Sequence, residues 1–241
     1  MKTTTTLFAL LISISMVNAQ NWGKNKIKGS GNEITVTRTT SDYDEISTGG
    51  SFSVELVAGK EGTITMTGDD NLLELIITKV ENNKLKIYIE KGAWFDSRGE
   101  FIKISIPFED ISKVDFGGSG KITTKNPIKT SNLEINLSGS GNAKIDANTS
   151  TLSAVLSGSG NLNVKGSTND ISIKLSGSGG IDCTAITSEN ATALISGSGN
   201  IDLNCSKSLI GKISGSGNIV YSGNPGSVDK KISGSGNILK E

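Results

Sequence analysis

The 241-residue chain contains no histidine, three prolines and only two arginines. Histidine is the side chain that proteins use most often as a general base near neutral pH, and it is a common metal ligand. Without histidine, the many serines lack the usual partner that activates a serine nucleophile. We therefore expect a protein that is not an enzyme, with no catalytic residue, no metal site and no cofactor.

An excess of positive charge is also missing, because 24 Lys and Arg residues balance 24 Asp and Glu residues. No surplus of either sign draws the chain toward nucleic acid or anionic lipid, so we expect no nucleic-acid partner. Long apolar runs are absent after residue 19. We predict no transmembrane segment, because a spanning helix needs about 20 mostly apolar residues.

The N-terminus has the pattern of a secretory signal. Lys2 supplies a positive charge, residues 7–17 form a largely apolar run, and Val17-Asn18-Ala19 resembles a cleavage site. The sequence predicts a signal peptide at residues 1–19. We expect the mature protein to be exported to the periplasm, the outer-membrane surface or the extracellular space.

Glycine, in contrast, is abundant, with 30 residues, and many of them stand in the phrase Gly-Ser-Gly, followed most often by Asn. The seven main copies follow one another at intervals of 18 to 21 residues. A near-constant period in this range is typical of a solenoid, in which each repeat forms one coil. The copies begin at Gly118, Gly139, Gly158, Gly177, Gly197, Gly215 and Gly234, with an outlying copy at Gly29.

Apolar residues alternate with polar ones on both sides of each copy. Leu152, Ala154 and Leu156 precede one copy at alternate positions, and Leu162 and Val164 follow it in the same way. This period of two predicts a strand with one buried face before the phrase and another after it. The sequence therefore predicts an all-β, two-sheet solenoid whose coils consist of a strand, a Gly-Ser-Gly corner, a second strand and a looser polar turn.

The corner explains the glycines, since a tight reversal between strands needs a positive φ. A dinucleotide-binding loop would be followed by a helix, whereas a strand follows every copy here. A calcium-binding repeat would place Asp regularly after the glycines, but only Asp182 and Asp202 stand there. In a stack of coils, the residues after the corners should form a hydrogen-bonded column. That column consists of Asn142, Asn161, Asn200, Asn218 and Asn237.

The only two cysteines, Cys183 and Cys205, lie in adjacent coils. Export would permit a disulfide between them. However, they stand six and eight residues after the starts of their corners, which implies a Cα separation of about 8 Å, beyond the usual reach of a disulfide. We predict two buried, unbridged thiols, with a disulfide as the alternative.

Residues 20–116 differ from the regular repeats of residues 117–241. Ten of the eleven aromatic residues precede position 117, and the Gly-Ser-Gly rhythm is absent between residues 31 and 118. Alternation persists there, for example at Phe52, Val54 and Leu56 and again at Ile64 and Met66. We predict larger, irregular coils in this half, joined without a linker to the repeats in one continuous domain of residues 20–241.

This half also carries several short motifs. They are Tyr43-Asp44-Glu45-Ile46, Phe52-Ser53-Val54-Glu55-Leu56, Gly68-Asp69-Asp70-Asn71-Leu72-Leu73, Lys84-Leu85-Lys86-Ile87, Ile104-Ser105-Ile106-Pro107 and Phe116-Gly117-Gly118-Ser119-Gly120. Together they resemble the head GIN domain family, described as auto-transporter adhesins of Bacteroidetes-type bacteria. The resemblance covers residues 40–240 and implies a right-handed β-solenoid, similar in shape to pectate lyases and hexapeptide acyltransferases but without their catalytic residues. It also implies a role in adhesion.

Contact residues are hard to find, because exposed aromatic rings are scarce. The best candidates are Trp94, Phe95 and Arg98, in a polar loop where two aromatics are adjacent. Such a loop either caps the solenoid, contacts a second subunit of a homo-oligomer (a trimer or a dimer), or binds a ligand. At the C-terminal end, Lys230 occupies an inward position, where a charge is typical of a protected sheet edge.

We interpret the chain as an exported, non-enzymatic interaction module, a cell-surface adhesin head with an unknown protein or glycan ligand. The alternative is an envelope protein that binds or modifies polysaccharide, as pectate lyases do, and a purely structural envelope component is a third class. Modification would need paired carboxylates. The densest acidic groups, Asp69-Asp70 with Glu74 and Asp42-Asp44-Glu45, lie in predicted turns, where Asp is frequent for backbone reasons.

Overall fold

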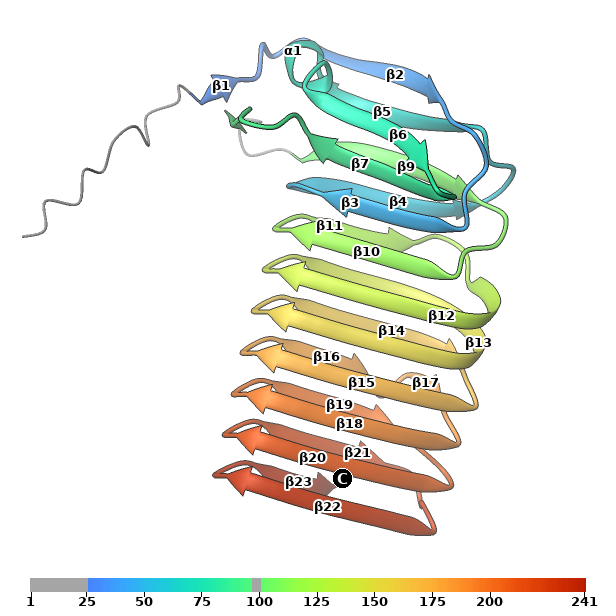
Figure 1. The fold of residues 1–241 in the computed structure, drawn as a ribbon, viewed down its shortest axis with the longest axis vertical. Coiled ribbons are helices and arrows are strands. Elements are labelled where there is room, and N and C mark those ends of the chain that lie inside the picture. Colours follow the sequence, from blue (N-terminus) through green and yellow to red (C-terminus); the bar gives the residue numbers. More distant parts are fainter. Residues whose placement is uncertain (1–25, 97–100) are drawn as a thin grey trace, which may run out of the picture.

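The computed structural model describes residues 26–96 and 101–241, and it is a β-solenoid in which strands stack along one axis (Figure 1). The predicted fold class is confirmed. The predicted signal peptide and Arg98 lie outside the described residues. The helix α1 (Asp70–Leu73) has four residues, and no helix in the described part of the chain is long and apolar enough to cross a membrane.

Each regular coil contributes one strand to each of two sheets. The front sheet contains the strands that precede the corners, and the back sheet contains those that follow them. The front sheet comprises β3 (Glu45–Gly49), β10 (Lys113–Gly118), β12 (Ile128–Gly139), the second half of β13 (Asn142–Gly158), β15 (Asp170–Gly177), β18 (Asn190–Gly197), β20 (Ser208–Gly215) and β22 (Ser227–Gly234). The back sheet comprises β4 (Phe52–Ala58), β11 (Lys121–Thr124), the first half of β13, β14 (Asn161–Ser167), β16 (Gly180–Cys183), β19 (Asn200–Asn204), β21 (Asn218–Ser222) and β23 (Asn237–Lys240).

Neighbouring coils are parallel and in register, so that equivalent residues lie opposite one another. Leu156 pairs with Leu137 in the preceding coil and with Leu175 in the next. The inward positions predicted from the alternation are buried, which confirms the two-sheet coil. They include Leu133, Ile135, Leu137, Leu152, Ala154, Leu156, Ile171, Ile173, Leu175, Ala191, Ala193 and Ile195 before the corners, and Ala143, Ile145, Leu162, Val164, Ile181, Cys183, Ile201, Leu203, Ile219 and Tyr221 after them.

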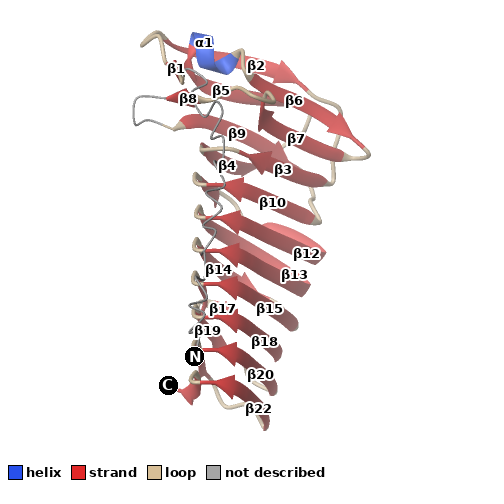
Figure 2. Cartoon of the chain, turned by 60° about the vertical axis from the view of Figure 1, so that its left-hand side comes forward, coloured by secondary structure: helices blue, strands red, loops and turns tan. Residues whose placement is uncertain are grey.

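The corners line up along one edge of the stack (Figure 2). Gly158 has a φ of 133°, and a Cβ there would lie 2.2 Å from the carbonyl oxygen of Gly139 in the preceding coil. The second glycine of the corner, Gly160, also leaves no room for a side chain, because a Cβ there would lie 2.2 Å from the carbonyl oxygen of Gly141. Both glycines of a corner are therefore required. The first needs glycine for its positive φ and for the close approach of the neighbouring backbone, and the second needs it for the close approach alone.

The predicted asparagine column forms, with one interruption. Asn161 Nδ2 donates to Asn142 Oδ1 at 3.0 Å, and Asn218 Nδ2 donates to Asn200 Oδ1 at 3.1 Å. Asn237 Nδ2 continues the column to Asn218 Oδ1 at 3.2 Å. Gly180 replaces asparagine in the coil between Asn161 and Asn200, so the ladder consists of two parts.

Both cysteines are buried free thiols, as predicted. Cys183 lies opposite Leu203, which places Cys205 two residues beyond it along the neighbouring chain segment. Burial raises the pKa of the Cys183 thiol to about 12. The thiol therefore stays protonated and acts as a small apolar core side chain.

The N-terminal end of the stack is closed by strands that run antiparallel to their neighbours. The sequence predicts the buried face of this region correctly, for example at Ile64 and Met66, but alternation does not give the direction of a strand. Asn82 and Asn83, with φ of 53° and 59°, form the turn of the hairpin β6–β7. The strands of this region are β1 (Ile27–Lys28), β2 (Glu33–Thr39), β5 (Thr63–Asp69), β6 (Ile76–Glu81), β7 (Lys84–Ile89), β8 (Phe95–Asp96) and β9 (Ile102–Phe108). The remaining short strand, β17 (Ile186–Thr187), belongs to the repeat region, where it pairs with β14. Antiparallel pairs are β2–β5, β5–β9 and β6–β7, whereas β3–β7 and β4–β9 are parallel.

A basic side chain lies at each end of the core. At the N-terminal end, Arg38 donates to the carbonyl oxygens of Leu73, at 2.6 Å, and Ile76. At the C-terminal end, Lys230 Nζ donates to the carbonyl oxygen of Ile238 at 2.9 Å and lies 4.9 Å from the centre of the Tyr221 ring. The inward-pointing lysine thus covers part of the open end of the core.

We predict that Gly158→Val destabilises the protein, because the side chain would need a strained φ and would collide with the preceding coil. The expected loss in the free energy of unfolding is on the order of 1–3 kcal/mol, measured by urea unfolding followed by circular dichroism. Gly59→Val is the control, since a Cβ at Gly59 has no atom within 4 Å. Equal losses in the two variants would contradict the role given to the corner.

We also predict that Leu156→Asp abolishes the cooperative unfolding of the repeat region, because it buries an unpaired carboxylate between the sheets. Lys144→Asp, at an exposed outward position of β13, should change the melting temperature little. Thermal unfolding of both variants, followed by circular dichroism, tests which positions of the coils point inward. Similar melting temperatures for the two variants would show that the assignment of inward and outward positions is wrong.

Candidate functional site

The acidic groups singled out in the sequence have structural partners. Asp70 accepts hydrogen bonds from the Ser30 hydroxyl at 2.5 Å and from Asn32 Nδ2 at 2.8 Å, which lower its pKa. Asp69 Oδ1 accepts from the Gly31 amide at 3.2 Å. These two carboxylates therefore hold the outlying Gly-Ser-Gly segment against the start of α1. Across residues 26–96 and 101–241, no group of three His, Cys, Asp or Glu side chains could hold a metal ion.

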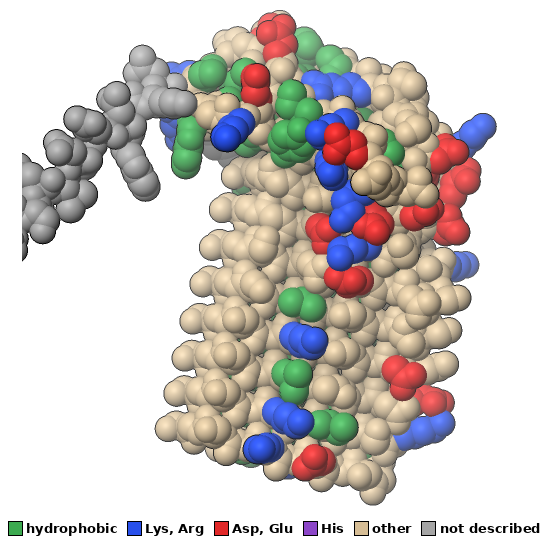
Figure 3. Space-filling view, viewed as in Figure 1, with side chains coloured by type: hydrophobic (Ala, Val, Ile, Leu, Met, Phe, Trp, Pro, Cys, Tyr) green, Lys and Arg blue, Asp and Glu red, His purple; other side chains and the backbone are tan. Residues whose placement is uncertain are grey.

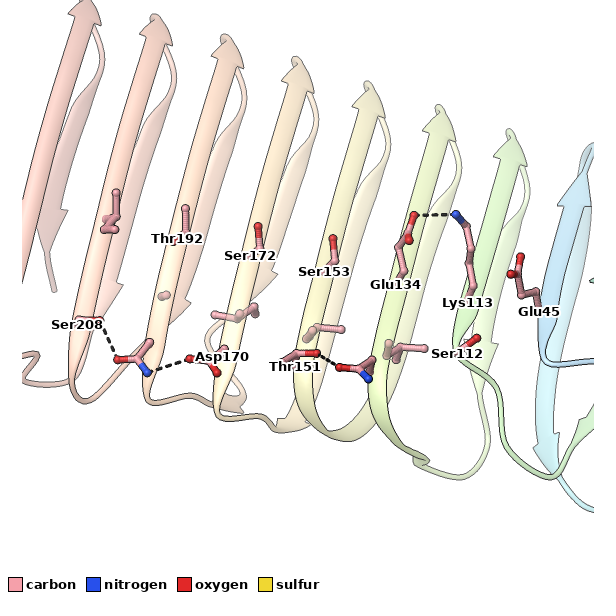
Figure 4. Close-up of a pocket in the computed structure, with 17 residues that line it drawn as sticks. Glu45, Ser112, Lys113, Glu134, Thr151, Ser153, Asp170, Ser172, Thr192 and Ser208 are labelled. Atoms are coloured by element: carbon pink, nitrogen blue, oxygen red, sulfur yellow. Dashed lines mark hydrogen bonds and ion pairs between the residues drawn. The ribbon is translucent and has the colours of Figure 1, made fainter.

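A shallow groove of about 680 Å³ on the front sheet runs along the solenoid axis and is here called the axial groove (Figure 4). One row of side chains stands five residues before the corners and another stands seven residues before them. Between the rows lie the backbones of strands whose inward side chains form the core. The first row contains Ser153, Ser172 and Thr192, between Lys113 and Glu134 at its N-terminal end and Ile210 at its C-terminal end. The second row contains Asn132, Thr151, Asp170, Asn190 and Ser208.

The second row is held together by hydrogen bonds between coils. Asn190 Nδ2 donates to Asp170 Oδ1 at 2.9 Å, and the Ser208 hydroxyl donates to Asn190 Oδ1 at 2.8 Å. The first row differs, because the hydroxyls of Ser153 and Ser172 contact no other described side chain through a hydrogen bond. The axial groove thus has one ordered polar wall and one row of hydroxyls that can bond to a ligand.

At its N-terminal end the axial groove meets a set of ion pairs, here called the charge ladder. Lys84 Nζ lies 2.8 Å from Glu45 and 3.2 Å from Asp115, and Lys113 Nζ lies 2.8 Å from Glu134. The hydrogen bond from Lys113 lowers the pKa of Glu134, and the hydrogen bond to Glu45 raises the pKa of Lys84. Charges of opposite sign are therefore matched across successive coils in this part of the front sheet.

The contact residues predicted from the sequence lie elsewhere. Trp94 is 68% exposed, whereas Phe95 is partly buried and packs against the core. Trp94 directly precedes strand β8, which begins at Phe95 and pairs with β1 at the N-terminal end of the solenoid. Neither residue lines the axial groove. Their role as a ligand or subunit contact stays a prediction. Sequence reasoning missed the axial groove, although the small polar residues that recur five positions before the corners were a usable signal.

Comparison with known proteins places the chain in a family. A family model described as "Putative auto-transporter adhesin, head GIN domain" matches residues 42–225. No curated protein matches the chain.

Solved structures share the fold. A putative adhesin from Bacteroides fragilis is 24% identical with a TM-score of 0.85, and the alignment covers 89% of this chain and 100% of that one. A putative lipid binding protein from Parabacteroides distasonis is 31% identical with a TM-score of 0.75, covering 90% of this chain and 99% of that one. A putative adhesin from Parabacteroides merdae is 21% identical with a TM-score of 0.71, covering 90% and 99%. The family model spans most of the chain, and the chain therefore belongs to the head GIN domain family of putative auto-transporter adhesins.

Proposed function

We propose that the protein is an exported, non-enzymatic interaction module, the head of a cell-surface adhesin, and that it binds its ligand along the axial groove. Membership of an adhesin family and the signal-like sequence at residues 1–19 support export and adhesion. The observation that carries the proposal is the row of hydroxyls at Ser153, Ser172 and Thr192. Within the described residues these hydroxyls make no hydrogen bond, whereas the opposite row of the axial groove is hydrogen-bonded from coil to coil.

The fold suits this role because the groove is built on strands. Every backbone group along its floor is paired with the coil above and below, so binding orders little of the protein. A single hydrogen bond contributes only about 0.5–1.5 kcal/mol. Useful affinity therefore requires several contacts at once, and a groove that crosses many coils provides them to an elongated ligand.

Binding without catalysis is favoured by the state of the carboxylates in the groove. Asp170 accepts a hydrogen bond from the Asn190 side chain. Glu134 forms an ion pair with Lys113, which lowers the pKa of Glu134. A general acid in a polysaccharide-cleaving enzyme needs the opposite shift, toward neutral pH. Both groups therefore behave as structural members of the wall.

A surface-binding assay with the labelled mature protein tests the proposal. Its panel consists of epithelial cells, mucin and extracellular-matrix proteins. The double variant Ser172→Met/Thr192→Met replaces two hydroxyls with longer, uncharged side chains that fill the axial groove, and it should reduce binding at least tenfold, a change of about 1.4 kcal/mol. The matched control, Ser178→Met/Ser198→Met, adds the same side chains at exposed corner serines of the same two coils. Equal loss in both variants, or no binding of the wild-type protein to any surface, would contradict the proposal.

We propose further that the module self-associates through Trp94, whose exposed ring would be covered in a trimer or a dimer. Multi-angle light scattering of the mature protein should give an oligomer mass, and Trp94→Ala should shift it to the monomer. Leu239→Ala removes an apolar side chain that is 54% exposed at the opposite end and should leave the mass unchanged. A wild-type monomer would refute the self-association.

A further inference from the structure

A second column on the front sheet stands three residues before the corners. It comprises Val155, Lys174, Leu194, Lys212 and Lys231, and we call it the lysine strip. The two apolar members are half-buried and the three lysines are exposed. Figure 3 shows apolar and basic side chains alternating along this face toward the C-terminal end, below the matched charges of the charge ladder.

The lysines of the strip have no partners in the described part of the chain. Lys174, Lys212 and Lys231 make no hydrogen bond or ion pair there, in contrast to Lys84 and Lys113 of the charge ladder. Lys212 and Lys231 are moreover directly opposite one another on adjacent strands. Like charges in that position are destabilising. Asp229 stands two residues before Lys231 on the same face, but it forms no ion pair with either lysine in the described part of the chain. The repulsion between the two lysines is therefore not offset by a direct ion pair, which points to a role outside folding.

We infer that the lysine strip and the adjacent hydroxyl row of the axial groove bind an acidic polysaccharide whose chain lies along the solenoid axis. The inference rests on the proposed function and names the ligand class. Lys174 and Lys212 are two coils apart, about 10 Å at the strand spacing of a sheet, which suits a polymer with a carboxylate on every second sugar. Val155 and Leu194 present apolar surface to the C–H faces of the sugars, beside a recess of about 210 Å³ that also contains Ser176 and Ser196.

Other polyanions fit the strip less well. Single-stranded nucleic acid is bound largely by stacking of bases on aromatic rings. The residues of the lysine strip and of the axial groove include no aromatic side chain, and the buried Tyr221 is the nearest ring in the repeats. The formal charge of zero likewise gives no general attraction to nucleic acid or to an anionic membrane. Hydroxyls and aliphatic groups beside isolated lysines match an acidic glycan.

Two carboxylates allow a test of opposite sign. Asp229 stands two residues before Lys231 on β22, so its charge opposes binding there. Glu55 is exposed on β4 of the back sheet and lines neither the lysine strip nor the axial groove. Asp229→Asn should therefore strengthen binding, and Glu55→Gln should leave it nearly unchanged.

The experiment measures the affinity of the mature protein for hyaluronan and polygalacturonate by biolayer interferometry, with carboxyl-reduced forms of both polymers as neutral controls. The wild-type protein should bind at least one acidic polymer, more weakly as salt rises, and neither reduced form. Lys174→Gln/Lys212→Gln/Lys231→Gln should weaken binding at least tenfold. Lys121→Gln/Lys129→Gln/Lys144→Gln removes the same charge from exposed lysines outside the strip and should weaken it less than twofold. Asp229→Asn should tighten binding two- to fivefold.

Several results would overturn the inference. These are failure to bind either acidic polymer, equal binding of the reduced polymers, equal loss in the two triple variants, or a strip-dependent affinity that appears only for oligonucleotides or anionic vesicles. The surface-binding assay separates this failure from failure of the proposed function. If the groove variant Ser172→Met/Thr192→Met loses surface binding while the strip variant keeps it, the adhesive role stands and the acidic-glycan ligand is wrong.

Discussion

Each coil pairs with the next through backbone hydrogen bonds at the strand spacing of a sheet, about 4.8 Å, and the rest of the structure depends on this spacing. The spacing brings corner against corner so closely that a Cβ at Gly160 would lie 2.2 Å from a backbone oxygen of the preceding coil. It also places equivalent residues opposite one another, as Leu156 lies opposite Leu175. A residue type that recurs in the sequence therefore becomes a column in space. Inward columns form the core, the Asn161–Asn142 bond belongs to a column at the corner edge, and outward columns form the faces.

A stack of this kind has two ends at which the core and the strand edges lack a neighbour. The two ends are closed differently, yet each uses a basic side chain to bond backbone carbonyl oxygens. Arg38, on the antiparallel strand β2 at the N-terminal end, donates to the carbonyl oxygens of Leu73 and Ile76, and Lys230 donates to that of Ile238 at the C-terminal end. A long side chain with an apolar stem can cover core surface while its charged group satisfies carbonyl oxygens. At each end, a basic side chain thus satisfies backbone carbonyl oxygens beside the core.

The coil architecture could be predicted from the sequence because it depends on local patterns. Alternation identified inward residues such as Leu156, and the Gly-Ser-Gly period located the corners. The antiparallel strands of the N-terminal end could not be predicted, since Ile64 and Met66 alternate in the same way whichever direction their strand runs. The axial groove was missed for a related reason. It depends on how side chains of successive coils line up, and Ser153 and Ser172 are unremarkable until they are placed in one row.

Residues of the outward columns can be substituted with little loss of stability, because substitutions at exposed positions usually alter the free energy of unfolding by less than about 0.5 kcal/mol. The charge ladder and the lysine strip occupy the same face and obey the same packing rules, yet only the ladder is neutralised. Folding alone would accept an uncharged residue at Lys212, opposite Lys231, and would gain from the lost repulsion. A compact protein ligand would touch only a few members of such a column. A linear polymer that lies along the axis would contact all of them, so the periodicity that stabilises the core also gives the surface a repeat that a polymeric ligand can match.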